Sequence, residues 1–226
     1  TIIGGENSVS PAVEKQLKSK GILVERIYGS NRYETSEKIA TEVMKEHKDI
    51  KSVAVANGDR GLADAISFSS VAGEKTIPIL LSNNSGNIKL PEGLMDKSSI
   101  RDSYIIGGKQ SVPESVESDF KNVTRISGSN RNDTNAKIIE KFYPNEDLEY
   151  AFVAKDGYNN QEMLIDGLAI GAYAASVKSP IVLTHGKLTN AQLDALRGKR
   201  IKNITQVGGG MNSMATTELL LINSTK

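Results

Sequence analysis

The chain repeats itself at a spacing of roughly 100 residues, and this repetition limits the possible folds more than any other feature. Residues 26–35 (RIYGSNRYET) recur as residues 125–134 (RISGSNRNDT). Three further segments, 2–5, 62–65 and 77–81, recur in the same order as 105–108, 164–167 and 179–183. Because order and offset are both kept, a whole unit has been duplicated rather than a short motif.

Two units are complete, and a third is represented only by its last part. Gly4-Gly5 followed by Ser8 corresponds to Gly107-Gly108 followed by Ser111, so the chain opens near the end of a unit. We therefore expect three segments: residues 1–24 as the C-terminal part of a first repeat, 25–123 as a second repeat and 124–226 as a third. The first repeat is expected to lack its beginning.

Within a unit, short β-rich runs alternate with segments of helical periodicity, a pattern typical of parallel βαβ units. The runs at residues 77–81 and 180–183 are apolar throughout, as expected for strands covered on both faces. Each repeat is thus predicted to be an α/β domain of the Rossmann-like, three-layer αβα type with a parallel sheet.

Helix starts are marked by capping residues. Asn31 and Asn130 each precede an acidic residue by three positions, so both asparagines are interpreted as N-caps. Ser111, three residues before Glu114, predicts a capping box.

Composition excludes several function classes. The chain has no cysteine and two histidines, which leaves no thiolate chemistry and no histidine-rich metal site, and we predict neither metal nor cofactor. A formal charge of +1 gives no broad basic surface for nucleic acid. No segment approaches the ~20 apolar residues of a membrane span, so no membrane insertion is expected.

Arg32 and Arg131 recur in the first turn of a predicted helix, where the helix dipole makes a cation mildly unfavourable. A partner explains them better than helix stability does. That partner is either a carboxylate of the neighbouring repeat or an anionic ligand held by the guanidinium fork together with helix N-terminal amides.

Arg26 and Arg125 end strands at the same edge of each unit, and ligands of open α/β sheets lie beyond the carboxyl ends of strands. A solvated strand end is the simpler interpretation of each arginine alone. Asp64 and Asp166 begin helices rich in small residues; the dipole alone explains an aspartate there, and the small residues suggest packing faces between repeats.

The adjacent glycines at 4–5, 107–108 and 208–209 match neither a dinucleotide fingerprint nor a phosphate loop. They favour a tight turn between strand and helix. No carboxylate pair recurs beyond Asp64 and Asp166, and the two histidines occupy non-equivalent places.

The RI-x-GSNR-x-acidic-T block, the GLADA segment at 61–65 and the PILL strand at 78–81 resemble the cell-wall-binding repeat 2 family of Gram-positive surface proteins. The resemblance covers nearly the whole chain, and it looks closest to the anchoring region of a high-molecular-weight S-layer subunit or a paralogous cell-wall protein.

This resemblance implies an extracellular, non-catalytic protein that attaches non-covalently to an anionic secondary polysaccharide of the wall, with three repeats packed as a pseudo-threefold assembly. It also associates an apolar motif with anchoring. That motif is interpreted as a packing strand, here Ile79, Leu80 and Leu81, and in the later copy Ile181, Val182 and Leu183.

The expected ligand contacts are Arg26, Arg32, Tyr33, Arg125, Arg131, Asp64 and Asp166. Tyr33 becomes Asn132 in the next copy, so a ring stacked on sugar is expected in one repeat only. Two other functions stay open: a nucleotide- or sugar-binding Rossmann-like enzyme, and a purely structural module that packs against another S-layer polypeptide.

Overall fold

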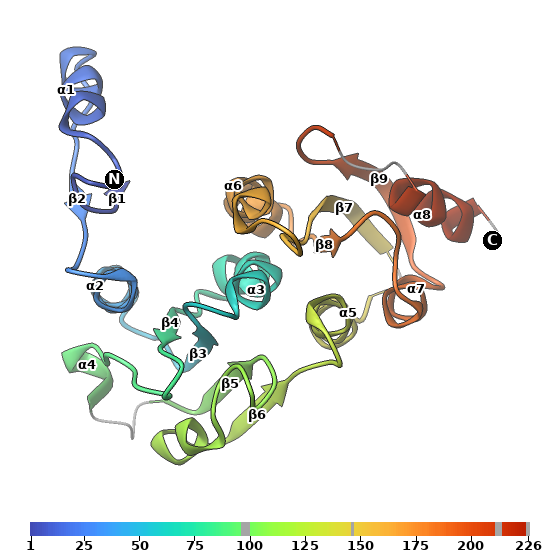
Figure 1. Ribbon diagram of the computed structural model, residues 1–226, viewed down its shortest axis with the longest axis horizontal. Coiled ribbons are helices and arrows are strands. Elements are labelled where there is room, and N and C mark those ends of the chain that lie inside the picture. The colour runs from blue at the N-terminus through green and yellow to red at the C-terminus, as the bar shows by residue number, and fades with distance from the viewer. Residues whose placement is uncertain (96–99, 146, 211–213, 225–226) are drawn as a thin grey trace.

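The computed structural model describes residues 1–226 except 96–99, 146, 211–213 and 225–226. Strands and helices alternate along the chain, and all paired strands are parallel (Figure 1). Three sheets result, with strand orders β1-β2, β4-β3-β5-β6 and β8-β7-β9. The predicted mixed α/β class with parallel sheets is confirmed.

The strands are β1 (Ile2–Ile3), β2 (Arg26–Ile27), β3 (Ser52–Asn57), β4 (Ile79–Ser82), β5 (Asp102–Ile106), β6 (Val123–Ile126), β7 (Asp147–Lys155), β8 (Ile181–Thr184) and β9 (Arg200–Gln206). The α-helices are α1 (Pro11–Ser19), α2 (Arg32–Glu46), α3 (Leu62–Lys75), α4 (Glu92–Met95), α5 (Arg131–Phe142), α6 (Ile165–Ser176), α7 (Asn190–Leu196) and α8 (Met214–Ser224). Two 3₁₀ segments, η1 (Glu114–Asp119) and η2 (Gln161–Leu164), complete the chain.

The N-terminal fragment consists of β1, α1 and β2. Its two short strands pair with each other, and α1 buries none of its residues. Figure 1 shows this fragment at one end of the molecule and the C-terminus at the other. Ile22 and Leu23 between α1 and β2 are exposed, so the fragment has little core of its own.

The four-stranded sheet is covered on both faces. Val53, Val55 and Leu80 pack against α2, α4 and η1, whereas Ala54 and Ala56 pack against α3 and α5. This alternation follows from the pleat, since successive residues of a strand point to opposite faces.

The three-stranded sheet repeats this plan. Phe152, Ala154, Ile181 and Leu183 face α6, and the opposite face packs against α5, α7 and α8. Helix α5 therefore contributes to both units, since it also packs against α3.

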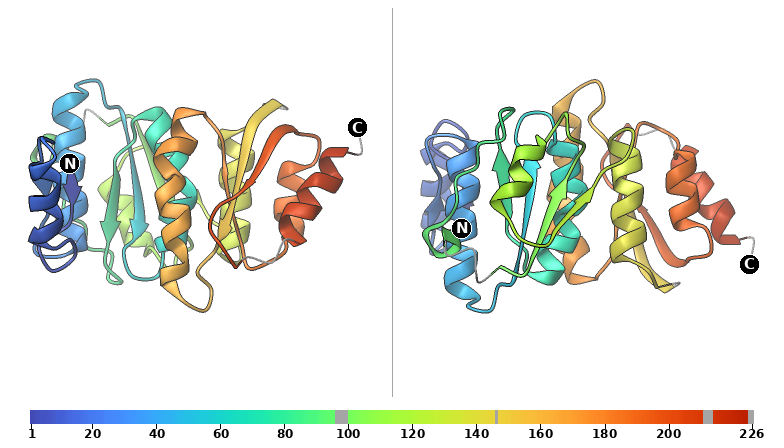
Figure 2. Two further views of the ribbon diagram at one scale, coloured as in Figure 1. Left: turned by 90° about the horizontal axis from the view of Figure 1, so that it is seen from above. Right: turned by 90° about the horizontal axis from the view of Figure 1, so that it is seen from below.

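Helices α3 and α6 join the two units and lie side by side between the sheets (Figure 2). Their contact is close because small residues face each other: a Cβ at Gly171 would meet Ser69 Oγ at 2.8 Å, and one at Gly73 would meet Ala175 Cβ at 2.7 Å. The suggestion that these small residues form packing faces between repeats is confirmed.

One predicted helix start is wrong. The segment after the Gly107 turn is a 3₁₀ helix that begins at Glu114 with Pro113 at its N-cap, and no side chain caps it. The Glu114 carboxylate instead accepts a hydrogen bond from Lys109 Nζ (2.8 Å), so no capping box with Ser111 forms.

Hydrogen bonding links each Arg-Ile strand to the preceding segment. β2 pairs with β1 and β6 pairs with β5, so both strands add an edge to the sheet that precedes them in sequence. The proposed division at 24/25 and 123/124 therefore describes units of sequence, whereas the sheets extend to Ile27 and Ile126.

Candidate functional site

The loops that follow the carboxyl ends of the strands gather at one edge of the two complete units. Arg131 Nη1 at the start of α5 donates to Asp156 O after β7 (2.8 Å), and Gln161 Nε2 donates to Asp59 O after β3 (3.2 Å). We call this surface the carboxyl edge. It is where parallel α/β sheets commonly bind ligands.

The Gly-Ser-Asn-Arg turn is a self-contained helix start. Asn31 Oδ1 accepts from Tyr33 N and Glu34 N (both 3.0 Å), and Glu34 Oε2 accepts in return from Ser30 N (3.0 Å). Asn130 caps α5 in the same way. A Cβ at Gly29 would overlap the Glu34 Cβ, which explains the glycine. Both asparagines are N-caps as predicted, and the amides they cap are not free for a ligand.

Arg32 lies half exposed at the carboxyl edge. Its Nη1 donates to Gly58 O (2.5 Å) and lies 3.7 Å from Asp59 Oδ1. Tyr33 donates its hydroxyl to Asp59 Oδ2 (2.7 Å), and this hydrogen bond raises the pKa of the Tyr33 hydroxyl above its ordinary value. Arg32, Tyr33 and Asp59 thus form one polar cluster, in which Arg32 is exposed and the other two residues are partly buried.

Arg131 occupies the equivalent place in the next unit but is less exposed. Asn132, which replaces Tyr33, donates to Leu183 O (2.8 Å) and so points into the fold. For both arginines the nearest partner is a backbone carbonyl at the end of the following strand, in addition to nearby carboxylates.

Arg26 and Arg125 have different surroundings, because both are largely buried. Arg125 Nη1 donates to Gly107 O (2.8 Å) and Val112 O (3.0 Å), and its Nε donates to Glu117 Oε1 (2.6 Å). Arg26 makes the equivalent bonds to Gly4 O, Val9 O and Glu14. These arginines hold the loop after the adjacent glycines in place, so their donors serve the fold.

Asp64 is buried beside the turn after β5. It is 8% exposed, its Oδ1 has no hydrogen-bond partner among the described residues, and a Cβ at Gly107 would meet its Oδ2 at 2.9 Å. Burial raises the pKa of Asp64 to about 6, although the charge of Arg131 acts in the opposite direction.

Asp166 repeats the arrangement, because a Cβ at Gly208 would collide with its carboxylate. Gly107 and Gly208 both have positive φ values (121° and 85°). The turns at Gly107 and Gly208 are therefore tight turns packed against a carboxylate, which would repel an anionic phosphate.

The apolar motif lies in edge strands of the two sheets. Ile79, Leu80 and Leu81 belong to β4, with Leu80 fully buried; Ile181, Val182 and Leu183 belong to β8 and are all buried. Their side chains pack against α2 and α3 in one unit and against α5 and α6 in the other.

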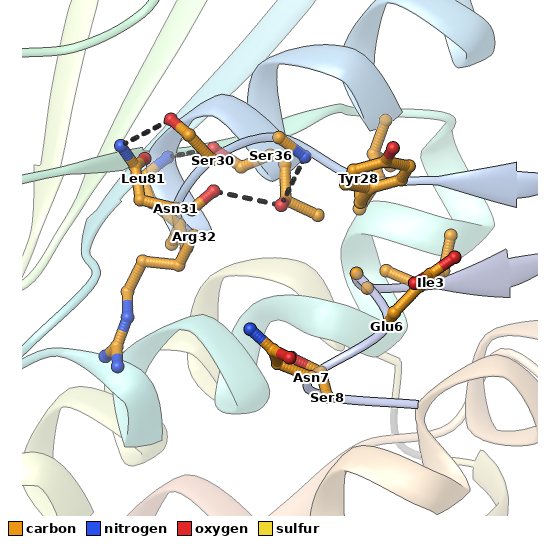
Figure 3. Close-up of a pocket in the computed structure, with 15 residues that line it drawn as sticks. Ile3, Glu6, Asn7, Ser8, Tyr28, Ser30, Asn31, Arg32, Ser36 and Leu81 are labelled. Carbon is orange, nitrogen blue, oxygen red and sulfur yellow. Dashed lines mark hydrogen bonds between the residues drawn. The ribbon is translucent and has the colours of Figure 1, made fainter. Parts of the chain in front are cut away.

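A cavity of about 790 Å³ lies between the loop after β1 and the start of α2 (Figure 3). Glu6, Asn7 and Ser8 border it on one side, and Asn31 and Arg32 on the other.

The corresponding space in the second unit is filled by protein. There Asn57 Nδ2 donates to Ser111 O (2.7 Å), and Asp64 packs on Gly107. Among the described residues nothing plays this part for Gly4 and Ser8, so we interpret the cavity as a packing space.

Several polar residues of the carboxyl edge were missed by the sequence reasoning, namely Asn57, Asp59, Asp156, Tyr158 and His185. Each lies at or just after the end of a buried strand, which is the signal that locates them. These residues differ between the repeats, so recurrence in the sequence does not reveal them.

No group of three or more histidine, aspartate or glutamate side chains that could hold a metal ion occurs in the described part of the chain. Over the same residues, no helix combines the length and the apolar character that a membrane crossing requires.

Fold and surface together define a tandem-repeat α/β binding module with its polar residues at one edge of parallel sheets. The family described as Cell wall binding domain 2 (CWB2) matches residues 26–117 and 125–217, and the chain belongs to this family. It is an extracellular protein associated with the cell wall.

The chain is similar to known proteins in both structure and sequence. Cwp8 and Cwp6 from Clostridium difficile both superpose with a TM-score of 0.82, at 35% and 33% identity over 98% and 96% of this chain. N-acetylmuramoyl-L-alanine amidase LytC of Bacillus subtilis is 29% identical over 92% of the chain, and the amidase enhancer of the same organism is 37% identical over 80%. The chain covers 37% and 35% of the two structures, and 40% and 23% of the two Bacillus proteins.

Proposed function

We propose that this chain anchors a surface protein, non-covalently and without catalysis, to an anionic secondary polysaccharide of the Gram-positive cell wall. The observation that carries the proposal is that both complete units match a cell-wall-binding family and present an arginine at the same place on the carboxyl edge. The amidase names of two relatives belong to proteins of which this chain covers less than half.

The proposed polymer contacts are Arg32 and Arg131, with Tyr33 beside Arg32. Arg32 is half exposed and makes one hydrogen bond within the described part of the chain, so most of its guanidinium donors are available to an anion. Arg26 and Arg125 are not retained in the site because the fold uses their donors, and buried Asp64 is not retained because the polymer does not reach it. Asp166 packs on Gly208 in the equivalent turn of the third repeat and is not retained either.

The carboxylate packed on Gly107 disfavours a nucleotide-binding enzyme, since the phosphate would have to displace Asp64 from the turn. Saturable binding of ATP or a nucleotide sugar in calorimetry would select that alternative.

The exposed face of α6 supports a role in packing against another repeat. When the two repeats are aligned on Asp64 and Asp166, Leu168 corresponds to Ile66. Ile66 is 7% exposed because it packs on α6, whereas Leu168 is 63% exposed. We propose that the exposed face of α6 packs against a further repeat, in addition to the two complete ones, as in a pseudo-threefold assembly. The apolar strands β4 and β8 support the anchoring surface by holding α2, α3, α5 and α6 in place.

Binding to purified wall sacculi tests the anchoring function. The protein should pellet with sacculi, remain in solution with sacculi stripped of their anionic polymer, and be released by high salt because exposed ion pairs are screened. Equal pelleting with stripped walls would contradict the proposal.

Charge reversal tests the arginines. Arg32→Glu together with Arg131→Glu should weaken binding to sacculi by roughly tenfold or more, since a charge-assisted hydrogen bond contributes about 1.5–3 kcal/mol. Lys48→Glu with Lys51→Glu changes the charge equally at the opposite edge and should bind nearly as the parent does. If the arginine variant instead unfolds while the lysine variant is stable, the arginines are structural.

A further inference from the structure

A small cavity lies at the carboxyl ends of β7 and β8, and neither Arg32 nor Arg131 borders it. Its volume is about 230 Å³, and Lys155, Asp156, Met163, Thr184 and His185 border it. Pockets for drug-sized ligands measure about 300–1,000 Å³, so this one suits a single small ring.

Asp156 gives the cavity an unused hydrogen-bond acceptor. Its side chain is buried (1% exposed), Oδ1 accepts from Tyr158 N (3.0 Å) and lies 3.6 Å from His185 Nδ1. Oδ2 has no partner among the residues that the structure describes. A buried carboxylate oxygen without a partner is costly, which marks it as an acceptor for a bound group.

The equivalent position in the second repeat has no unpaired hydrogen-bond acceptor. Asn57, the counterpart of Asp156, uses its side chain fully: Oδ1 accepts from Asp59 N and Arg60 N, and Nδ2 donates to Asn84 and Ser111 O. The unused acceptor is therefore a property of the third repeat and not of the shared repeat plan.

Lys155 supplies donors to the same cavity. It is only partly buried, and its side chain forms no ion pair or hydrogen bond within the described ranges. Its Nζ would lie 3.5 Å from a Cβ at Gly210, which places the ammonium group at the border of the cavity.

An aromatic surface adjoins these polar groups. Tyr158 is 67% exposed, and its ring centroid lies 4.8 Å from that of His185 at an interplanar angle of 57°. Met163 adds an exposed apolar surface. An exposed aromatic ring beside buried polar groups offers an apolar face and hydrogen bonds together, as the two sides of a pyranose ring require.

From this arrangement we infer that the third repeat binds one neutral sugar residue in this cavity. Asp156 only accepts and Lys155 only donates, and a hydroxyl group can do both. The carboxylate disfavours a bare anion such as phosphate, and the lysine disfavours a bare cation. The inference rests on the proposed function for the natural source of the sugar, a residue of the wall polymer.

Titration of the isotope-labelled 226-residue chain with free glucose, galactose and N-acetylglucosamine tests the cavity by NMR. At least one sugar should shift the amide signals of Tyr158, Thr184 and His185 saturably, with a Kd of about 1–10 mM. Inorganic phosphate and calcium chloride are the competing probes. Shifts at these residues with phosphate or calcium but no sugar, or no shifts up to about 50 mM sugar, would overturn the inference.

Single substitutions in the cavity distinguish a loss of sugar contacts from a loss of folding. Tyr158→Ala and Asp156→Asn should each weaken sugar binding at least fivefold; asparagine already occupies the equivalent position in the second unit, so Asp156→Asn should fold. Tyr173→Ala removes a similarly exposed ring on α6 and should bind as the parent does. Unchanged sugar affinity in both cavity variants would also refute the assignment.

The pelleting experiment keeps this inference separable from the anchoring function. If the chain pellets with sacculi but does not bind free sugars, the anchoring function is supported and the sugar site is refuted. If the chain binds sugar through Tyr158 but does not pellet with sacculi, the sugar site is supported and the anchoring function is refuted.

Discussion

The buried carboxyl of Asp64 makes the stability of the fold depend on pH. The carboxyl is buried against Gly107, and burial raises its pKa from an ordinary 3.8 to about 6. The folded protein therefore binds a proton that the unfolded chain releases between these values. The stabilisation is fully present below about pH 4 and is lost as pH rises through about 6, by at most about 3 kcal/mol.

Asp64→Asn should remove this pH dependence. We expect the variant to be more stable than the parent by about 1–3 kcal/mol at pH 7.5 and nearly equal to it at pH 4, because the amide resembles the protonated acid. Urea unfolding at both pH values measures the difference.

Asp166→Asn provides the matched control, since Asp166 has the same place in the third repeat but is partly exposed. The stability change from this substitution should be smaller, because less of the side chain is buried. A stability gain for Asp64→Asn of equal size at pH 4 and pH 7.5 would exclude titration of this carboxyl as the cause.

At the scale of elements, the contact of α3 with α6 determines how the two units fit together. Gly167 packs on Ile66 and Gly171 on Ser69, so glycine lets the helix axes approach. Glycine within a helix costs up to about 1 kcal/mol relative to alanine, which indicates that close packing compensates for lower helix propensity.

Gly171→Leu should separate these helices. Overpacking of this kind costs about 1–3 kcal/mol, and we expect a lower Tm in calorimetry. Ala172→Leu adds similar bulk at the neighbouring exposed position of the same helix and should change stability by about 0.5 kcal/mol or less. Equal losses in the two variants would argue against a close interface.

At the scale of the whole molecule, the exposed face of α6 is an apolar surface. Ile165, Leu168 and Tyr173 are all exposed on this helix, and the N-terminal fragment exposes Ile22 and Leu23. Apolar surfaces of this kind are typical of interfaces. The 226-residue chain should therefore self-associate as its concentration rises.

Leu168→Lys should reduce this self-association. The change replaces an exposed leucine with a good helix former, so the free energy of unfolding should shift by about 0.5 kcal/mol or less. Sedimentation velocity over a concentration series measures the effect. Leu220→Lys makes the same substitution at an exposed position of α8 and should leave association unchanged; a monomeric parent chain would contradict the prediction.

The sequence by itself determined the repeat, the alternation of strands and helices, and the asparagine caps. These features depend on local patterns: periodicity follows from which face is buried, and Asn31 and Asn130 cap the helices that directly follow them. The same locality explains why the family could be recognised from three motifs in order.

Only the tertiary structure decided which recurring residues face solvent. Arg26 and Arg32 are six positions apart and equally repeated, yet Arg26 is buried under the loop after Gly4 and Arg32 reaches the surface. Asn57 and Asp156 occupy equivalent positions in the two repeats. A distant loop supplies a hydrogen-bond partner, Ser111 O, to Asn57, whereas Asp156 Oδ2 has no partner among the described residues. Burial and long-range hydrogen bonds depend on contacts between segments far apart in the chain, which no local pattern records.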